Sequence, residues 1–254
     1  MAFNSTLVFD APKYARLAGC AYLAVIVLGL FGEALVRATL LVPGDAQATF
    51  TKIEAAQTLW RAGIAGDLLM HELDVPLIVF FYLLLKPVSQ PLALLATVLN
   101  IVQTCVLVAN KLTLVVPLLV LDVMTASASQ LSDAVYSNLV ATAFMATKLH
   151  GHGFAVGLVF FGFASLVRGH LIFKSGFLPK PLGVMMALAG GCYLANSFAL
   201  LLMPSLATAI FPAVLFPAFM GELALCLWLS VKGIDGDRWR HQRLAQSEQT
   251  TAGK

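Results

Sequence analysis

LWRAGIAGDLLMHELDVPLIVFFYLLL, residues 59–85, is the stretch that decides the fold. Its apolar residues cover more than the roughly 20 positions that a helix needs to cross a bilayer. Asp67, Glu72 and Asp74 interrupt it. A charged side chain at the centre of a membrane helix costs about 2.5–3.5 kcal/mol. The stretch therefore predicts a transmembrane helix whose acidic residues face the interior of a helical bundle.

The composition of the whole chain agrees with this interpretation. Of the 254 residues, 59% are hydrophobic and 11% are charged, and the mean hydropathy is +0.87. Soluble domains carry about 25% charged residues, so a water-soluble fold would lack polar surface. No basic run with interleaved aromatic residues indicates nucleic-acid binding. The four cysteines lie in apolar runs without CxxC spacing, which predicts neither a zinc knuckle nor a disulfide framework.

Turn signals divide the rest of the chain into further apolar spans. We expect an all-α integral membrane bundle of about six transmembrane helices, with residues 1–232 as the membrane domain and residues 233–254 as a polar, basic cytoplasmic tail. The expected spans are residues 14–42, 59–85, 92–121, 148–173, 182–203 and 206–231. The expected connections include a short N-terminal segment (1–13), a polar linker (46–58), a hydrophilic loop (122–133), and an interfacial helix or the first turns of span four (137–148).

The distribution of Lys and Arg predicts the orientation of the bundle. An even number of spans places both termini on one side, and eleven Lys and Arg residues fall on that side against four on the other. Arg37 is counted on the outer side, and Arg168 on the side of the termini. By the positive-inside rule, both termini are cytoplasmic.

Five carboxylates fall inside the expected spans: Glu33, Asp67, Glu72, Asp74 and Glu222. Facing lipid, they would together cost on the order of 10 kcal/mol, which rivals the stability of a whole domain. The alternating direction of the spans places Glu33, Asp67 and Lys111 in the outer half of the bundle. Asp74 and Glu222 should lie just below them. We therefore predict one buried acidic pocket, open outward or sealed.

The acidic residues of residues 59–85 share one helical face. Asp67, His71 and Asp74 are spaced i, i+4, i+7, whereas Glu72 points elsewhere. Pro76 cannot donate a hydrogen bond to the carbonyl of Glu72, which predicts a kink beside this face. Such an arrangement is typical of sites for ions, protons or polar headgroups. The structural alternative is that lysine, asparagine and glutamine side chains pair these groups and tie the helices together.

These considerations give the candidate site residues. The candidate catalytic residues are Asp67, Asp74, Glu33 and Glu222, and the candidate ligand-binding residues are His71, Lys111, Asn110, His150 and Asn196. One histidine of the His150/His152 pair could join Asp67 and His71 in a zinc centre with three protein ligands. No HExxH or comparable spacing supports such a centre, so no metal ligand is predicted and the cofactor stays unknown.

Several motifs in a fixed order resemble the bacterial domain of unknown function 4386 family. They are GDLLM (66–70) with Asp74, His150 leading to GLVFFG (157–162), SGFLP (175–179) and GELAL (221–225). The similarity covers residues 14–233. The resemblance implies a multi-span protein of the bacterial inner (plasma) membrane, and it brings no activity or site residues. Asp67, Asp74 and Glu222 fall within its motifs, whereas His71 and Glu72 are not part of the pattern.

Three functions are open at this point. An intramembrane enzyme or binder of a lipophilic small molecule would use Asp67 or Asp74 as general acid and Glu33 or Glu222 as base, so that Asp67→Asn abolishes turnover while the fold survives. A transporter or proton- or ion-coupled carrier would bind cargo at the same carboxylates and form an oligomer, since six spans are few for alternating access. A sensor or accessory subunit would use the basic segment 238–243 to meet anionic lipid or a partner. The residues slightly favour the first function.

Overall fold

A computed structural model of the chain describes residues 10–127 and 131–252. Within these residues the chain is almost entirely helical and forms no strand. Six of the described helices are long and apolar enough to cross a membrane, which confirms the predicted fold class. Parts of three expected segments lie outside the described residues, namely 1–9 of the N-terminal segment, 128–130 of the loop and 253–254 of the tail.

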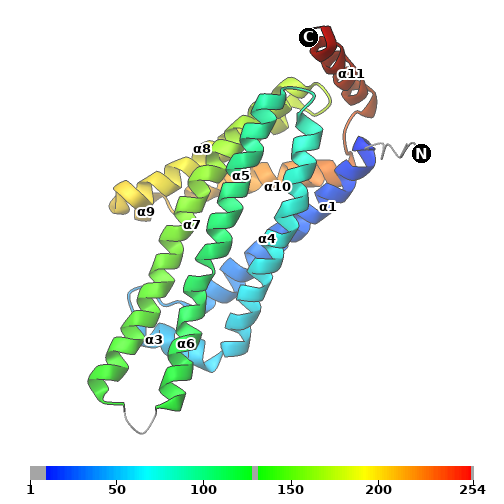
Figure 1. Ribbon diagram of the computed structural model, residues 1–254. Helices are drawn as coiled ribbons and strands as arrows, with labels where there is room; N and C mark the ends of the chain where they lie inside the picture. The colour runs from blue at the N-terminus through cyan, green and yellow to red at the C-terminus, as the bar shows by residue number, and fades with distance from the viewer. Residues whose placement is uncertain (1–9, 128–130, 253–254) are drawn as a thin grey trace, which may run out of the picture.

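The helices follow one another with short connections. In chain order they are α1 (Ala11–Leu30), the π-helix η1 (Phe31–Arg37), α2 (Ala38–Leu40), α3 (Ala46–Ala55), α4 (Gln57–Leu85), α5 (Gln90–Asn110), α6 (Leu112–Ala126), α7 (Asp133–Ser175), α8 (Lys180–Leu202), α9 (Pro204–Ile210), the 3-10 turn η2 (Ala213–Leu215), α10 (Phe216–Val231) and α11 (Gly236–Ala252). We call the end of the bundle that holds the start of α1, the α4–α5 turn and α11 the proximal end. The opposite end, which holds α3 and the α6–α7 connection, is the distal end (Figure 1).

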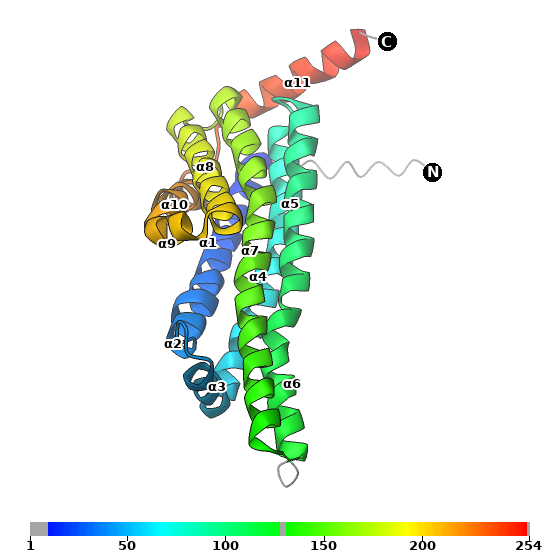
Figure 2. The same ribbon diagram turned by 90° about the vertical axis from the view of Figure 1, so that its left-hand side faces the viewer.

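The helices form two layers (Figure 2). In one layer α4, α5, α6 and α7 run side by side, and α1, α8 and α10 cover one side of it. At 1.5 Å per residue, α7 is about 65 Å long and α8 about 35 Å, so α8 covers only part of α7. The two pack closely because a Cβ atom at Gly169 or Gly183 would meet backbone atoms of the facing helix.

Two elements differ from the expectation, and for a third the structure decides between the two expected alternatives. The first ten residues of the expected linker 46–58 form α3, whose N-terminus is capped by Asp45 Oδ1 accepting from the Ala48 N–H at 2.8 Å. Residues 137–148 are the first turns of the continuous helix α7. The expected span 206–231 is divided, because α9 ends at Ile210 and α10 begins only at Phe216. Pro212 lies in this interruption and lacks the N–H that would continue a helix.

The segment predicted as a polar tail forms the helix α11, which docks onto the proximal end. The Trp239 side chain is buried, and its Nε1 donates a hydrogen bond to the Leu84 carbonyl at 3.0 Å. Gln246 Nε2 donates to the Lys86 carbonyl at 2.9 Å. Both carbonyls lie at the end of α4, where the last carbonyl oxygens of a helix have no N–H donors from the helix itself. Side chains of α11 therefore cap α4.

Two apolar clusters fill the interior of the described chain. The proximal cluster includes Phe81, Leu171 and Leu229, and the distal cluster includes Trp60 and Leu118. Along α4, along α5 and α6, and along α7, the buried charged side chains lie between these two clusters. The fold therefore collects the polar side chains in the middle of the bundle.

Candidate functional site

The polar side chains between the apolar clusters form two centres. The distal centre comprises Glu33, Arg37, Asp67, Asn110, Lys111 and His150. The central centre comprises Tyr22, His71, Asp74, Asn100, Gln103, Arg168, Tyr193 and Glu222. Asp67 and Asp74 are seven residues apart on α4, about 10 Å along its axis. The prediction of one shared acidic pocket is therefore wrong, because the carboxylates divide between two centres.

In the distal centre, one buried carboxylate lies between two cations. Asp67 has no exposed surface. Arg37 Nη1 donates to Asp67 Oδ2 at 2.6 Å, and Lys111 Nζ lies 3.0 Å from the same oxygen. Both cations are buried, so cations outnumber carboxylates inside this centre. Asp67, Lys111 and Glu33 do share one region, as the depth argument predicted.

Glu33 belongs to the distal centre only at its rim. Its Oε2 accepts a hydrogen bond from Arg37 Nε at 2.8 Å, but 67% of its side chain is exposed. The expectation that Glu33 faces inward is therefore wrong. The ion pair with Arg37 compensates the charge of a carboxylate that the bundle does not enclose.

Irregular helical segments position the three charged groups around Asp67. Glu33 and Arg37 lie in the π-helix η1, where the Ala38 N–H bonds to the Glu33 carbonyl five residues earlier. A Cβ at Gly32 would overlap Asp67 Oδ1, so the glycine lets the carboxylate approach η1. Lys111 occupies the break between α5 and α6.

Asn110 and His150 link α5 to α7 beside these charges. Asn110 Nδ2 donates to the His150 carbonyl at 2.9 Å and lies 3.1 Å from His150 Nδ1. Both residues are buried, whereas His152 is exposed, with its Nδ1 3.1 Å from the Lys148 carbonyl. Over the described part of the chain, no three His, Cys, Asp or Glu side chains are grouped so that they could hold a metal ion.

The central centre begins at the acidic face of α4. His71 is 2% exposed, neither of its ring nitrogens forms a hydrogen bond, and Nδ1 lies 3.7 Å from Asp74 Oδ2. Asp74 is largely buried and Glu72 is exposed, so the side chains point as the i, i+4, i+7 spacing predicts. α4 continues without a break through Pro76. A buried imidazole without hydrogen-bond partners is unusual, since buried polar groups are normally paired.

Arg168 is the cation of the central centre, and it has no carboxylate in direct contact. Its side chain is 4% exposed and lies over the Phe81 ring, 4.5 Å from the centroid. Its Nη2 donates to Asn100 Oδ1, and Asn100 Nδ2 donates in turn to Gln103 Oε1 at 2.8 Å. Arg168 Nε has no hydrogen-bond partner.

Glu222 is the second carboxylate of the central centre. The Tyr193 hydroxyl donates to its Oε1 at 2.8 Å, and Tyr22 faces the same carboxylate. The charges of Arg168 and Asp74 both act on it. The predicted ligand-binding residue Asn196 is buried on α8, three residues after Tyr193.

Sequence reasoning missed the roles of Arg37 and Arg168. Both were counted as charges near the membrane surface, yet they are 7% and 4% exposed and lie inside the bundle. A signal for Arg37 existed, because it follows Glu33 by four residues, the spacing of a helical ion pair. The apolar residues on both sides of Arg168 in the sequence are a comparable signal that its side chain lies inside the bundle.

The six apolar spans around these buried centres define a multi-pass membrane protein. The chain belongs to the family described as domain of unknown function (DUF4386), which matches residues 17–233 and confirms the resemblance. An uncharacterized protein of Archaeoglobus fulgidus is 28% identical over 170 residues, which cover 67% of this chain and 83% of that protein. No solved structure matches the chain.

Proposed function

We propose that this protein is a small carrier that moves protons across a membrane, with the central centre as the site of proton binding and release. The observation that supports this proposal is a charge imbalance. In the central centre the charges of two carboxylates, Asp74 and Glu222, act on one cation, Arg168, with no direct ion pair between them in the described part of the chain. The distal centre has no such excess of carboxylates, because its buried cations Arg37 and Lys111 are matched only when the exposed Glu33 at its rim is counted with Asp67.

An unbalanced charge in a low-dielectric interior is costly, so the central centre favours the uptake of one proton. Three groups there can accept it: Asp74, Glu222 and the imidazole of His71. His71 has no competing hydrogen bond and lies beside Asp74, which suits it to pass a proton along α4. The other titratable groups around this centre include Tyr22, Tyr193, Cys192 and Cys226.

The same geometry disfavours an acid–base enzyme that uses the predicted residues. The two cations at Asp67 pair with its charged form, which has no proton to donate as a general acid. The exposed Glu33 does not line an enclosed site. Of the four predicted catalytic residues, only Asp74 and Glu222 keep the roles of proton donor and acceptor, and both belong to the central centre.

In this proposal the proximal end faces the cytoplasm of a bacterial cell, and the protein lies in the inner membrane. Lys86, Lys174 and Lys180 mark the turns of the proximal end, and Arg238 and Arg240 lie on α11. Removing the buried Arg37 and Arg168 from the comparison leaves the excess of basic residues at this end.

The proposal is tested with purified protein reconstituted in liposomes that contain a pH-sensitive dye. A potassium gradient with valinomycin sets an inside-negative potential, and the rate of internal acidification is measured. The wild-type protein should acidify the lumen faster than protein-free liposomes. Asp74→Asn and Glu222→Gln should return the rate to that of protein-free liposomes, because each removes a carboxylate that makes the central centre bind a proton.

Glu72→Gln is the matched control, since Glu72 lies on the same helix but is exposed. It should leave the rate unchanged. The proposal fails if wild-type and protein-free liposomes acidify equally, or if the control slows the rate as much as the two central variants.

A further inference from the structure

We propose that Arg168 and the cavity in front of it form a binding site for a small monovalent anion such as chloride. We further infer that anion binding at this site favours proton uptake by the central centre, and this second part rests on the proposed function. The site and the coupling have separate tests.

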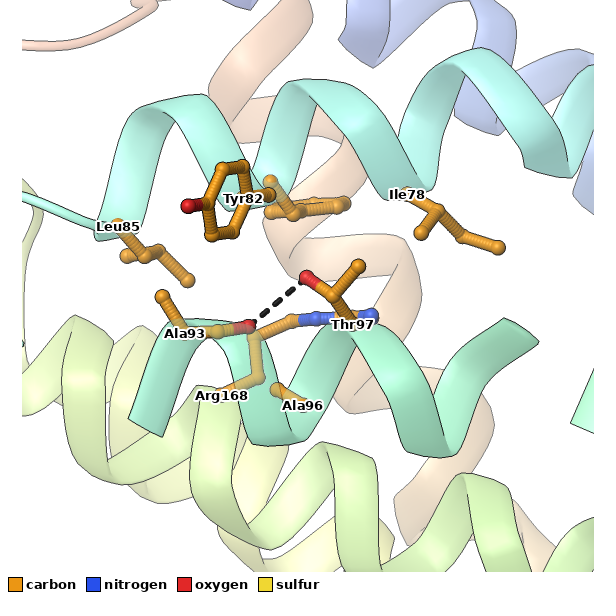
Figure 3. Close-up of a pocket in the computed structure, with 8 residues that line it drawn as sticks. Ile78, Tyr82, Leu85, Ala93, Ala96, Thr97 and Arg168 are labelled. Carbon is orange, nitrogen blue, oxygen red and sulfur yellow. Dashed lines mark hydrogen bonds between the residues drawn. The ribbon is translucent and has the colours of Figure 1, made fainter. Parts of the chain in front are cut away.

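The cavity lies between α4 and α5 near the proximal end (Figure 3). Its lining residues are Ile78, Phe81, Tyr82, Leu85, Ala93, Ala96, Thr97 and Arg168. Arg168 reaches into the space between the two helices from α7 (Figure 3). The Thr97 hydroxyl is already engaged, because it donates to the Ala93 carbonyl at 2.8 Å. Arg168 is therefore the charged group that faces the cavity.

Arg168 has more donors than its protein neighbours use. A guanidinium carries five N–H donors, and the Asn100 carbonyl oxygen is its hydrogen-bond acceptor. Nε is buried without a partner. Because this side chain is 4% exposed and forms no ion pair within the described chain, an anion in the cavity would supply the missing acceptor and a negative charge in direct contact with the guanidinium.

The surroundings of the cavity also favour negative charge. Ala93, Ala96 and Thr97 belong to the first two turns of α5, whose N-terminus carries the positive end of the helix dipole. The end of α4 carries the opposite, negative end of a helix dipole, because its last carbonyl oxygens point away from the helix. Two of those carbonyls accept hydrogen bonds from the α11 side chains of Trp239 and Gln246. The α11 cap therefore weakens the field that would repel an anion.

The size of the cavity limits the anion. Its accessible volume is about 10 Å³, room for one water-sized particle. This is too small for a phosphate or a lipid headgroup and leaves a monatomic anion, and chloride, which is larger than water, requires the lining side chains to move slightly apart. Lys86 Nζ lies over the Tyr82 ring, 5.8 Å from its centroid, and so adds a second positive charge near the cavity.

Anion binding and proton binding are coupled through the charges of the central centre. Asp74 and Glu222 already outnumber Arg168, so an added anion increases the negative charge there. Proton uptake on His71, Asp74 or Glu222 offsets that charge. The side chains of Tyr22 and Tyr193 lie beside Glu222. A bound anion would therefore make proton uptake at the central centre more favourable.

The binding site is tested with radiolabelled chloride and protein in lipid nanodiscs. Wild-type protein should bind chloride saturably, and more tightly at acidic than at neutral pH. Arg168→Gln should weaken binding by about tenfold or more, because it removes the charged donor. Ala96→Leu should weaken it comparably, because the larger side chain fills the cavity while Arg168 stays. Arg61→Gln, which removes an exposed arginine of α4, should bind as the wild type does.

Two results would overturn the anion site: no saturable binding by wild-type protein, or equal binding by the wild type and the folded Ala96→Leu variant. The coupling is tested by replacing chloride with gluconate in the liposome assay. Proton uptake should fall in gluconate; equal uptake in both media overturns the coupling and leaves the proton function standing. If proton uptake is absent in both media, the proposed function fails, and chloride binding in nanodiscs still decides the anion site by itself.

Discussion

Asp67 shows how a single residue changes its meaning between sequence and structure. As a lone carboxylate in an apolar run, it was a candidate general acid. In the structure it is the shared partner of two buried cations from η1 and the α5–α6 break. Its first role is therefore to compensate charge and hold three segments together.

This role predicts that Asp67→Asn destabilises the fold, contrary to the expectation that the fold survives this change. Removing the carboxylate leaves the buried Lys111 without its ion-pair partner and Arg37 paired only with the exposed Glu33, and breaking a buried ion pair typically costs about 3–5 kcal/mol. The midpoint of thermal unfolding in detergent, measured for purified protein, should fall clearly. Glu33→Gln is the control and should change the midpoint little, because its side chain is 67% exposed. Equal midpoints for wild type and Asp67→Asn would contradict this account.

Residue orientation was predictable where it depends on helical periodicity alone. The buried positions of Asp67 and His71 and the exposed position of Glu72 follow from their spacing. The inward positions of Arg37 and Arg168 were not predictable in this way. A long arginine side chain near a helix end can extend to the membrane surface or turn inward, and the neighbouring helices decide between the two.

At the scale of elements, the contact of α7 with α8 depends on glycine. A Cβ at Gly183 would lie 2.6 Å from the Gly169 carbonyl oxygen, whereas a Cβ at Gly191 on the same helix would have no neighbour within 4 Å. The helices can therefore approach only at positions without side chains.

Gly183→Ala should consequently destabilise the protein by about 1–3 kcal/mol, because the two backbones must separate. Gly191→Ala should leave stability unchanged or raise it slightly, since alanine favours helix more than glycine does. Urea or thermal unfolding of both variants in the same detergent makes the comparison. A destabilisation of the same size in both would show that helix propensity, rather than packing, explains the effect.

The helices α3 and α11 show which elements the sequence concealed. Both were assigned to connections because they are polar and carry no long apolar period. α3 is fixed by its Asp45 cap and by Phe50 and Ile53 in the distal cluster, and α11 is held mainly by the buried Trp239 and by Gln246. Their positions depend on contacts with distant segments, which local patterns do not record.

At the scale of the whole molecule, the proposed orientation gives a direct prediction. In a variant without native cysteines, Glu54→Cys on α3 should react with a membrane-impermeant maleimide on intact cells. Asp237→Cys on α11 should react only after the cells are broken, because the proximal end carries the basic residues. Both positions are exposed in the structure. The opposite labelling pattern would reverse the orientation, and labelling of both in intact cells would require an odd number of spans.

By itself, the sequence determined that this is a six-span helical membrane protein with acids on the inner face of α4. Span length, hydropathy and helical periodicity are local properties, and the bilayer acts on each span in the same way. Only the tertiary structure decided that the acids form two centres, that Asp67 is neutralised and that, among the described residues, no carboxylate forms a direct ion pair with Arg168. Those facts depend on which helices meet at which depth, and that is set by side-chain packing between segments far apart in the chain.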